Sequence, residues 1–228
     1  MAANTYPKNH RQDKQLIVEG KNDLLVIAEF MEQAGVLWPT NNPPVHIVDS
    51  IGKPNVPTHT KGILKSDLWE NLGIVVDADH DPQAAWQSSR NLCADFFPDI
   101  PQRIPDEGCW IGENNGKKLG IWIMPGNKRK GMLEDFLVDC MIHPDNSQRL
   151  WDFAKSSTTN ARDHHGATYS ENHSTKARVH CWLAWQEEPG NQLHQQIKGK
   201  RFNPKHGSGP QFVKWFQELF NPEMRPQV

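Results

Sequence analysis

Short apolar runs that alternate with segments of helical spacing constrain the fold of this chain more than any other feature. The runs lie at residues 16–18, 45–48, 73–76 and 120–124, and they are apolar almost throughout. Such strands are typical of a sheet that is covered on both faces. Strand–helix alternation in turn favours parallel strands that are joined by helical crossovers. We therefore predict an α/β fold over residues 15–143, with a doubly wound, Rossmann-like parallel sheet flanked by helices.

The spacing of apolar residues and the positions of glycine and proline predict the remaining elements. We predict helices over residues 24–34, 62–71, 81–96, 132–141 and 212–220, and loops over residues 49–60, 98–105, 156–175 and 198–210. Residues 1–14 are predicted to be a disordered leader, because they are polar and lack a periodic pattern. Residues 144–228 are predicted to be a C-terminal extension that packs on the α/β domain.

Composition excludes several classes of protein. The chain has 228 residues and a formal net charge of -2, so binding of nucleic acid would require a local basic patch. No apolar stretch approaches the ~20 residues of a membrane span, and the polar N-terminal residues contain no secretion signal. The four cysteines form no CxxC motif, which is typical of reduced thiols in a cytosolic protein. We therefore expect a cytoplasmic protein that is not bound to a membrane, and the sequence does not indicate its oligomeric state.

Acidic residues follow two of the predicted strands at the point where each strand ends. Glu19 leaves the first strand and Asp23 follows one helical turn later, whereas Asp77 and Asp79 end the third strand. In an open parallel sheet, ligands gather outside the carboxyl ends of the strands. Several carboxylates at one edge need protons or cations, and hard oxygen ligands suit one or two Mg²⁺ or Mn²⁺ ions. The alternative is that each acid caps a helix or faces solvent.

These two acidic motifs resemble those of a known family. Residues 16–23 read LIVEGKND, and residues 75–79 read VVDAD. Their combination resembles the Toprim domain of topoisomerases, bacterial primases, ribosomal-RNA maturation nucleases and OLD-family nucleases. The resemblance covers residues 15–125. It implies a compact Toprim-like α/β fold with a parallel sheet and a Mg²⁺-dependent site for nucleotidyl transfer or hydrolysis.

By this resemblance, particular residues correspond to those of the family site. Glu19 matches the motif glutamate, Asp77 and Asp79 match the DxD pair, and Asp23 matches an acid that OLD-type nucleases add. The segments IWIMPGN…GMLEDFLVD and KARVHCWLAWQEEPG further resemble a small standalone Toprim-like group of unknown function. The resemblance therefore implies a metal site and a catalytic centre at these four acids.

Hydrolysis is the reaction that the sequence favours among those of the Toprim family. Neither of the two tyrosines, Tyr6 and Tyr169, is placed as a strand-transfer nucleophile, and 228 residues are too few for a topoisomerase gate. The sequence also shows neither the template-handling module nor the zinc module of a primase. We expect a Mg²⁺- or Mn²⁺-dependent nuclease that acts on DNA or RNA, with the effector role in bacterial defence that the resemblance implies. Two alternatives stay open: a toxin module that a partner ATPase activates, and a non-catalytic protein that binds nucleotides or phosphate.

Further candidate residues lie beyond the two acidic motifs. Glu134 and Asp135 open the helix after the fourth strand, where they complete a second metal position or complement the helix dipole. Lys176, with Arg178 as its rival, is the candidate for the lysine that stabilises transition-state charge in OLD-like sites. Asp81 is instead expected to be the N-cap of a helix.

Two basic segments and a histidine-rich segment complete the set of candidates. Lys128, Arg129 and Lys130 precede the helix at 132–141, where they hold a phosphate or form an ordinary solvated loop. The basic loop at 198–210 has the same two interpretations. The histidines within residues 163–173 fit no zinc motif. The tryptophans of the C-terminal portion are predicted core residues, with stacking on nucleic-acid bases as the alternative.

Overall fold

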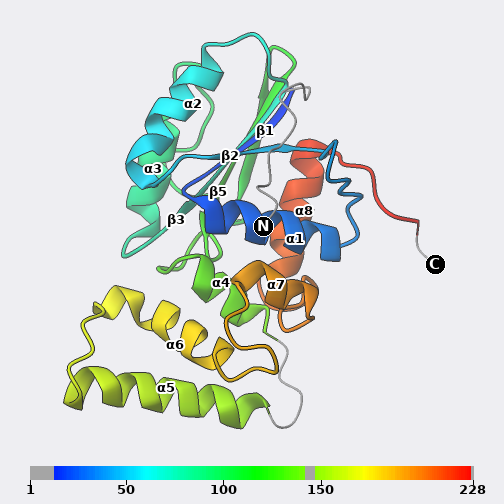
Figure 1. Ribbon diagram of the computed structural model, residues 1–228. Coiled ribbons are helices and arrows are strands. Elements are labelled where there is room, and N and C mark those ends of the chain that lie inside the picture. Colours follow the sequence, from blue (N-terminus) through cyan, green and yellow to red (C-terminus); the bar gives the residue numbers. More distant parts are fainter. Residues whose placement is uncertain (1–12, 142–146, 227–228) are drawn as a thin grey trace.

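The computed structural model describes residues 13–141 and 147–226, which form a five-stranded sheet with helices on both faces (Figure 1). The strands are β1 (Lys14–Val18), β2 (His46–Asp49), β3 (Asn71–Asp77), β4 (Trp110–Asn114) and β5 (Lys117–Met124), in the spatial order β2-β1-β3-β5-β4. β1, β2, β3 and β5 are parallel, and β4 pairs with β5 in the antiparallel sense. The predicted α/β class, with a mostly parallel sheet flanked by helices, is therefore confirmed.

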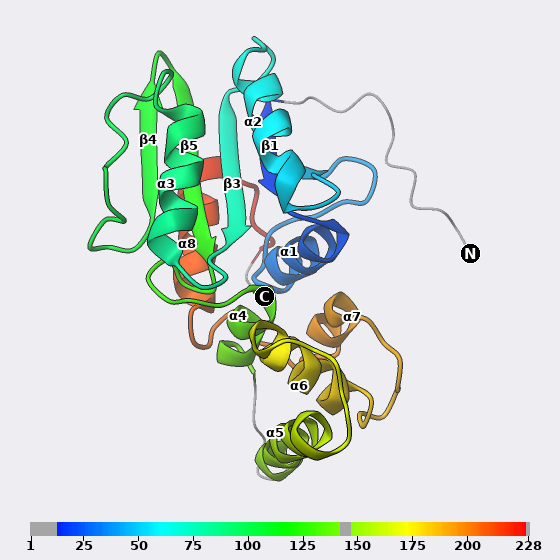
Figure 2. The same cartoon turned by 90° about the vertical axis from the view of Figure 1, so that its left-hand side faces the viewer.

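Helices on the two faces of the sheet come from different parts of the chain. The α-helices are α1 (Lys21–Gln33), α2 (Val56–Leu64), α3 (Pro82–Cys93), α4 (Leu133–Asp139), α5 (Ser147–His164), α6 (Ser174–Leu183), α7 (Leu193–Lys198) and α8 (Gly209–Phe220). In addition, Lys53–Asn55 and Glu171–His173 form short 3₁₀-helices. α1 and α8 cover one face and α2 and α3 cover the other (Figure 2), whereas α4 to α7 lie beyond the carboxyl ends of the parallel strands.

Each strand contributes side chains to two separate cores, because successive residues of a strand point to opposite faces. Leu16 and Val18 belong to the core under α1 and α8, whereas Ile17 between them belongs to the core under α2 and α3. In β5, Trp122 and Ile123 divide in the same way. The unbroken apolar runs in the sequence therefore follow from burial of the sheet on both faces.

Helix α8 packs directly against two glycines of the sheet. Gly73 of β3 and Gly120 of β5 are paired in register. A Cβ atom on Gly120 would lie 2.6 Å from Leu219 Cδ2 and 3.0 Å from the Trp215 ring. The glycine pair thus forms a shallow groove into which α8 inserts its large side chains, and this groove fixes how near the helix can approach.

Replacement of Gly120 by alanine is expected to destabilise the protein by about 1–3 kcal/mol, because the added methyl group forces α8 away from the sheet. Urea unfolding followed by tryptophan fluorescence measures this change. Gly62→Ala is the matched control, since no atom lies within 4 Å of the added Cβ. Gly62 lies inside α2, so the control is expected to gain up to about 1 kcal/mol from helix propensity. If the two variants had equal free energies of unfolding, the claim that α8 needs the glycine pair in order to pack on the sheet would be contradicted.

The predicted loop at 156–175 is wrong for most of its length. α5 continues through Ser156 to His164, and α6 already begins at Ser174. The sequence does not predict α5, because few of its residues are buried and one of these is polar. The buried residues are Trp151, Ala154 and Thr158. The Thr158 hydroxyl donates a hydrogen bond to the Ala154 carbonyl, which satisfies the buried polar group within the helix.

Three other boundaries also differ from the prediction. α2 begins at Val56 inside the predicted loop at 49–60, and it ends at Leu64, so the predicted helix at 62–71 is wrong beyond that residue. β4 was missed, because its sequence WIGEN is short and half-buried. Lys14, which the leader included, is the first residue of β1, while residues 1–12 lie outside the described part of the chain.

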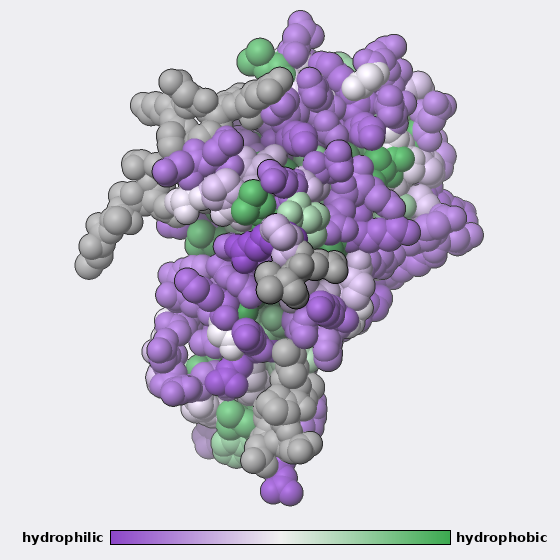
Figure 3. Space-filling model, turned by 90° about the vertical axis from the view of Figure 1, so that its right-hand side faces the viewer, coloured by the Kyte–Doolittle hydropathy of each residue, from purple (hydrophilic) through white to green (hydrophobic). Residues whose placement is uncertain are grey.

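No helix in the described part of the chain is long and apolar enough to cross a membrane. On the face that Figure 3 shows, hydrophobic residues form small separate groups among hydrophilic ones. All four cysteines are free, as the sequence predicted.

The order of the strands places a crevice between β1 and β3. The chain passes from β1 outward to β2 through α1, and then returns past β1 to β3 through α2. The connections after β1 and β3 therefore leave in opposite directions, which opens a crevice at the carboxyl ends of these two strands. Glu19 and Asp77 lie at that position.

Candidate active site

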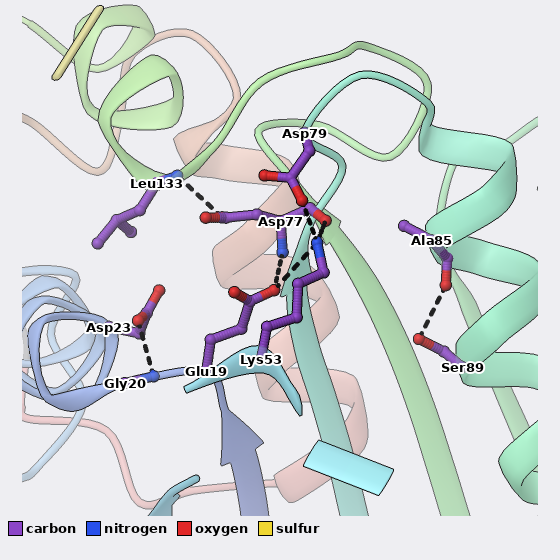
Figure 4. Close-up of polar contacts among 9 residues, drawn as sticks. All are labelled: Glu19, Gly20, Asp23, Lys53, Asp77, Asp79, Ala85, Ser89 and Leu133. Atoms are coloured by element: carbon purple, nitrogen blue, oxygen red, sulfur yellow. Dashed lines mark hydrogen bonds and ion pairs between the residues drawn. The ribbon is translucent and has the colours of Figure 1, made fainter. Parts of the chain in front are cut away.

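Glu19 and Asp77 form the centre of the site, and backbone hydrogen bonds hold both. The Asp77 N–H donates to Glu19 Oε1 at 2.9 Å, so the carboxylate that follows β1 contacts the last residue of β3 (Figure 4). The N–H of Leu133, the first residue of α4, donates to Asp77 Oδ1 at 3.0 Å. The ends of two strands and the start of one helix therefore hold these two side chains in place. Glu19 and Asp77 meet at one edge of the sheet, as the sequence predicted.

Asp23 and Asp79 lie on either side of this centre. Asp23 lies in the first turn of α1, and its Oδ2 accepts a hydrogen bond from the Gly20 N–H at 3.0 Å. β3 ends at Asp77, and Asp79 has a left-handed backbone with φ 51°. Backbone hydrogen bonds with Gly131 in both directions, at 2.9 and 2.8 Å, hold that conformation. Asp79 therefore lies beyond β3 and is not part of the strand end, where the sequence placed it.

Lys53 is the residue that sequence reasoning missed. Its Nζ lies 2.5 Å from Asp79 Oδ2 and 3.4 Å from Glu19 Oε1, and it donates to the Asp77 carbonyl oxygen at 2.8 Å (Figure 4). The ammonium group thus connects the two acidic motifs. A signal for it existed, because Lys53 follows the second strand, whose carboxyl end meets the same edge of the sheet.

Glu134 and Lys176 close the site from the helices beyond the sheet. The Glu134 side chain on α4 is only 4% exposed, and its Oε1 lies 3.2 Å from Lys176 Nζ on α6. Both line one open pocket of about 380 Å³, which we call the acidic pocket. Its charged lining residues are Glu19, Lys21, Asp23, Lys53, Asp77, Glu134 and Lys176. The structure therefore places Glu134 and Lys176, two of the further candidates from the sequence, beside the central acids.

Burial and mutual repulsion make ionisation of the central acids costly. Burial raises the pKa of Asp77 well above its usual range, and the charges of Glu19, Asp23 and Glu134 add to the rise. Burial also raises the pKa of Glu19 and, with the charge of Glu19, raises that of Asp23 to about 6. Burial alone would lower the pKa of Lys53, but its contacts with Asp79 and Glu19 leave it raised. The pocket therefore favours either a proton or an added cation beside these acids.

No three His, Cys, Asp or Glu side chains of the described residues are arranged to hold a metal ion as they stand. This holds for the histidine-rich segment at 163–173 as well. In the acidic pocket a physical reason is visible, because the ammonium group of Lys53 lies between Asp79 and Glu19. A divalent cation would have to replace that group before both carboxylates could contact it.

Asp23→Asn is expected to stabilise the metal-free protein at pH 7 by about 1–3 kcal/mol. The folded protein keeps a proton on Asp23 up to about pH 6, whereas the unfolded chain releases it near 3.8. The contribution of Asp23 to the free energy of unfolding therefore falls as the pH rises between these two values. Asparagine does not ionise, so this loss of stability disappears, and its side-chain oxygen still accepts the hydrogen bond from the Gly20 N–H. Thermal unfolding at pH 3.5 and pH 7 checks this, and an equal change at both values would contradict the raised pKa.

Asp135 and Asp81 have structural partners. Asp135 Oδ2 accepts from the Met132 N–H at 2.9 Å, so this predicted metal ligand closes the first turn of α4 and does not line the acidic pocket. Asp81 Oδ1 accepts from the N–H groups of Gln83 and Ala84, which confirms Asp81 as the N-cap of α3.

The predicted phosphate-binding residues separate into two kinds. Lys128 forms an ion pair with Asp106, and Arg129 forms one with Asp139. Lys130 has no ion pair among the described residues. Only Lys130 of these three therefore offers a cation that is free to meet an anion.

Comparison with known proteins identifies the family of this chain. A family described as "Protein of unknown function (DUF3226)" matches residues 13–221. The chain belongs to this family. The DUF3226 match extends from the start of the sheet to the end of α8, so every charged residue of the acidic pocket lies within it. No curated protein and no solved structure matches the chain.

Proposed function

We propose that this protein is a divalent-metal-dependent nuclease that hydrolyses phosphodiester bonds in DNA or RNA. The observation that carries the proposal is the meeting of Glu19, Asp77 and Glu134, from three separate elements, in one open pocket at the crevice of the sheet. The resemblance of both acidic motifs to the Toprim domain supports the same chemistry. Clefts with perturbed carboxylates are also where catalytic groups concentrate.

The donor atoms of the acidic pocket fit a hard cation. They are carboxylate oxygens, which suit Mg²⁺ or Mn²⁺, and neither cysteine nor histidine lines the pocket. Glu19 and Asp77 would hold the ion, with Glu134, Asp23 and Asp79 as further ligands. The Lys53 side chain is 42% exposed, so rotation toward solvent releases the carboxylates that it now contacts.

Residues of the chain would position the substrate and offset its charge. A bound Mg²⁺ or Mn²⁺ supplies a Lewis acid that polarises the phosphoryl group and lowers the pKa of water. The Leu133 N–H keeps the Asp77 carboxylate in a fixed orientation. The ammonium group of Lys176, which Glu134 holds, faces the same pocket and would neutralise charge that develops on the phosphoryl oxygens.

Metal dependence tests the proposal directly. Purified protein is incubated with supercoiled plasmid and with single-stranded RNA, in Mg²⁺, in Mn²⁺ and in EDTA, and Mn²⁺ binding is measured by calorimetry. We expect cleavage of at least one substrate in either metal and none in EDTA, with Mn²⁺ binding at micromolar to millimolar concentration. Absence of Mn²⁺ binding at millimolar concentration would contradict the metal site, and binding without cleavage would contradict an autonomous nuclease.

A further inference from the structure

A second pocket adjoins the acidic pocket and is lined by a different set of charged residues. Its volume is about 210 Å³, and it lies between the loop after β3, the loop before α4 and the first turns of α6. Lys130 and Arg178 supply its cations, with His80 and Thr175 beside them. We call it the basic pocket.

The two cations of the basic pocket have no anionic partner. Neither Lys130 nor Arg178 takes part in an ion pair among the described residues, and Arg178 Nε is buried without a hydrogen-bond acceptor. An unpaired buried donor of this kind is costly unless a ligand satisfies it. The arrangement leaves both cations available to an acceptor that comes from outside the chain.

The acidic residues that line the basic pocket are already engaged. Asp79 pairs with Lys53, and Asp135 accepts from the Met132 N–H. Glu171 forms an ion pair with Arg162. Asp79 and Glu171 are thus paired with cations that do not line this pocket. Asp135 keeps its negative charge, so two cations without an ion pair among the described residues, Lys130 and Arg178, face one such carboxylate.

The same elements line both pockets at successive residues. Met132 lines the basic pocket, and the next residue, Leu133, lines the acidic pocket. Likewise, Thr175 lines the basic pocket and Lys176 lines the acidic pocket. Asp79 of the basic pocket contacts Lys53 of the acidic pocket. A ligand that extends through one pocket therefore reaches the other directly.

We propose that the basic pocket binds a backbone phosphate of the nucleic-acid strand, next to the phosphate that the acidic pocket holds for cleavage. This inference rests on the proposed function. Arg178 offers a planar group with several donors and Lys130 a mobile ammonium, which together match the charge and the oxygens of a phosphodiester. The pocket positions the strand and does not take part in the chemical step.

Binding in EDTA tests this inference without any cleavage. Fluorescence anisotropy measures the affinity for labelled single strands of DNA and RNA, each about 15 nucleotides long. We expect Arg178→Gln to weaken binding of the preferred strand about 5- to 10-fold and to reduce the salt slope by about 1. Lys130→Gln, an exposed change that leaves the fold intact, is expected to weaken binding about 3-fold or more.

Lys61→Gln is the matched control, since Lys61 is an exposed lysine of α2 that lines neither pocket. Binding of Arg178→Gln and Lys130→Gln equal to that of the control would overturn the inference. Competition by inorganic phosphate, at constant ionic strength, in the wild type but not in Arg178→Gln would support it. A third outcome is that Arg178→Gln loses the binding of inorganic phosphate but keeps the wild-type affinity for the oligonucleotides. That result would assign the pocket to free phosphate and overturn the proposed contact with a backbone phosphate.

The two proposals fail in distinguishable ways. Strand binding that depends on Arg178, with no cleavage in any metal, contradicts the nuclease and leaves the phosphate pocket. Metal-dependent cleavage with strand affinity and salt slope unchanged in both variants contradicts the pocket and leaves the nuclease.

Discussion

Asp77→Asn is expected to lower the rate of phosphodiester cleavage by about 10³-fold or more, which is the largest effect that the structure predicts. Asp77 lies at the centre of the acidic pocket, where its N–H donates to Glu19 Oε1 and its Oδ1 accepts from the Leu133 N–H at the start of α4. Asparagine keeps an oxygen for the Leu133 N–H but supplies no charge. Single-turnover cleavage at saturating Mn²⁺ measures the loss.

Asp81→Asn is the control for that experiment. It removes one negative charge from the same loop, but Asp81 only caps α3, and asparagine is an equally good N-cap. We therefore expect unchanged cleavage by this variant. Cleavage by Asp77→Asn at the wild-type rate would show that the chemistry takes place elsewhere. An equal loss of cleavage in both variants would show that the loss reflects local charge alone. Because aspartate and asparagine are nearly equal in size, thermal unfolding should show that both variants are folded.

Lys53→Met is expected to raise the affinity for Mn²⁺ about 10-fold, which corresponds to ~1.4 kcal/mol. The ammonium group of Lys53 occupies the space between Glu19 and Asp79, so an incoming cation must displace it. Its removal leaves the carboxylates uncompensated. The metal-free variant should therefore unfold at a lower temperature than the wild type. Mn²⁺ binding should raise the unfolding temperature of the variant again and remove this difference.

Lys21→Met provides the comparison for Lys53→Met. Lys21 also lines the acidic pocket, but it has no ion pair among the described residues. Loss of its charge should change Mn²⁺ affinity far less, because nothing has to be displaced. Calorimetry on both variants separates competition by Lys53 from a general effect of pocket charge. A weaker affinity in Lys53→Met would mean that Lys53 assists the metal instead of competing with it.

Sequence reasoning located the strands and the central acids for the same physical reason. Strands that are buried on both faces produce unbroken apolar runs. Glu19 directly follows the run in β1, and Asp77 is the residue that ends β3 after its run. Parallel topology then brings such ends to one edge. The nearness of these acids could therefore be predicted without any structure, whereas metal binding and catalysis stay predictions.

Contacts that depend on packing could not be predicted in the same way. The position of Lys53 depends on the 3₁₀ turn after β2, and the left-handed backbone of Asp79 depends on a bridge to Gly131. α5 was missed because a polar helix can be stable when a narrow stripe packs on a neighbour, here α6. Tertiary contacts decided each of these features, and local composition carries little information about them.

Helix α8 has a consequence for how the protein is made. It covers the face of β3 and β5, and the Asn71 side chain at the start of β3 donates to the Leu219 carbonyl oxygen, 148 residues further along the chain. During synthesis, the strands leave the ribosome long before this helix does, and their apolar surface stays open to solvent and to chaperones. The crevice that holds Glu19 and Asp77 therefore gains its supporting layer only after α8 has been synthesised.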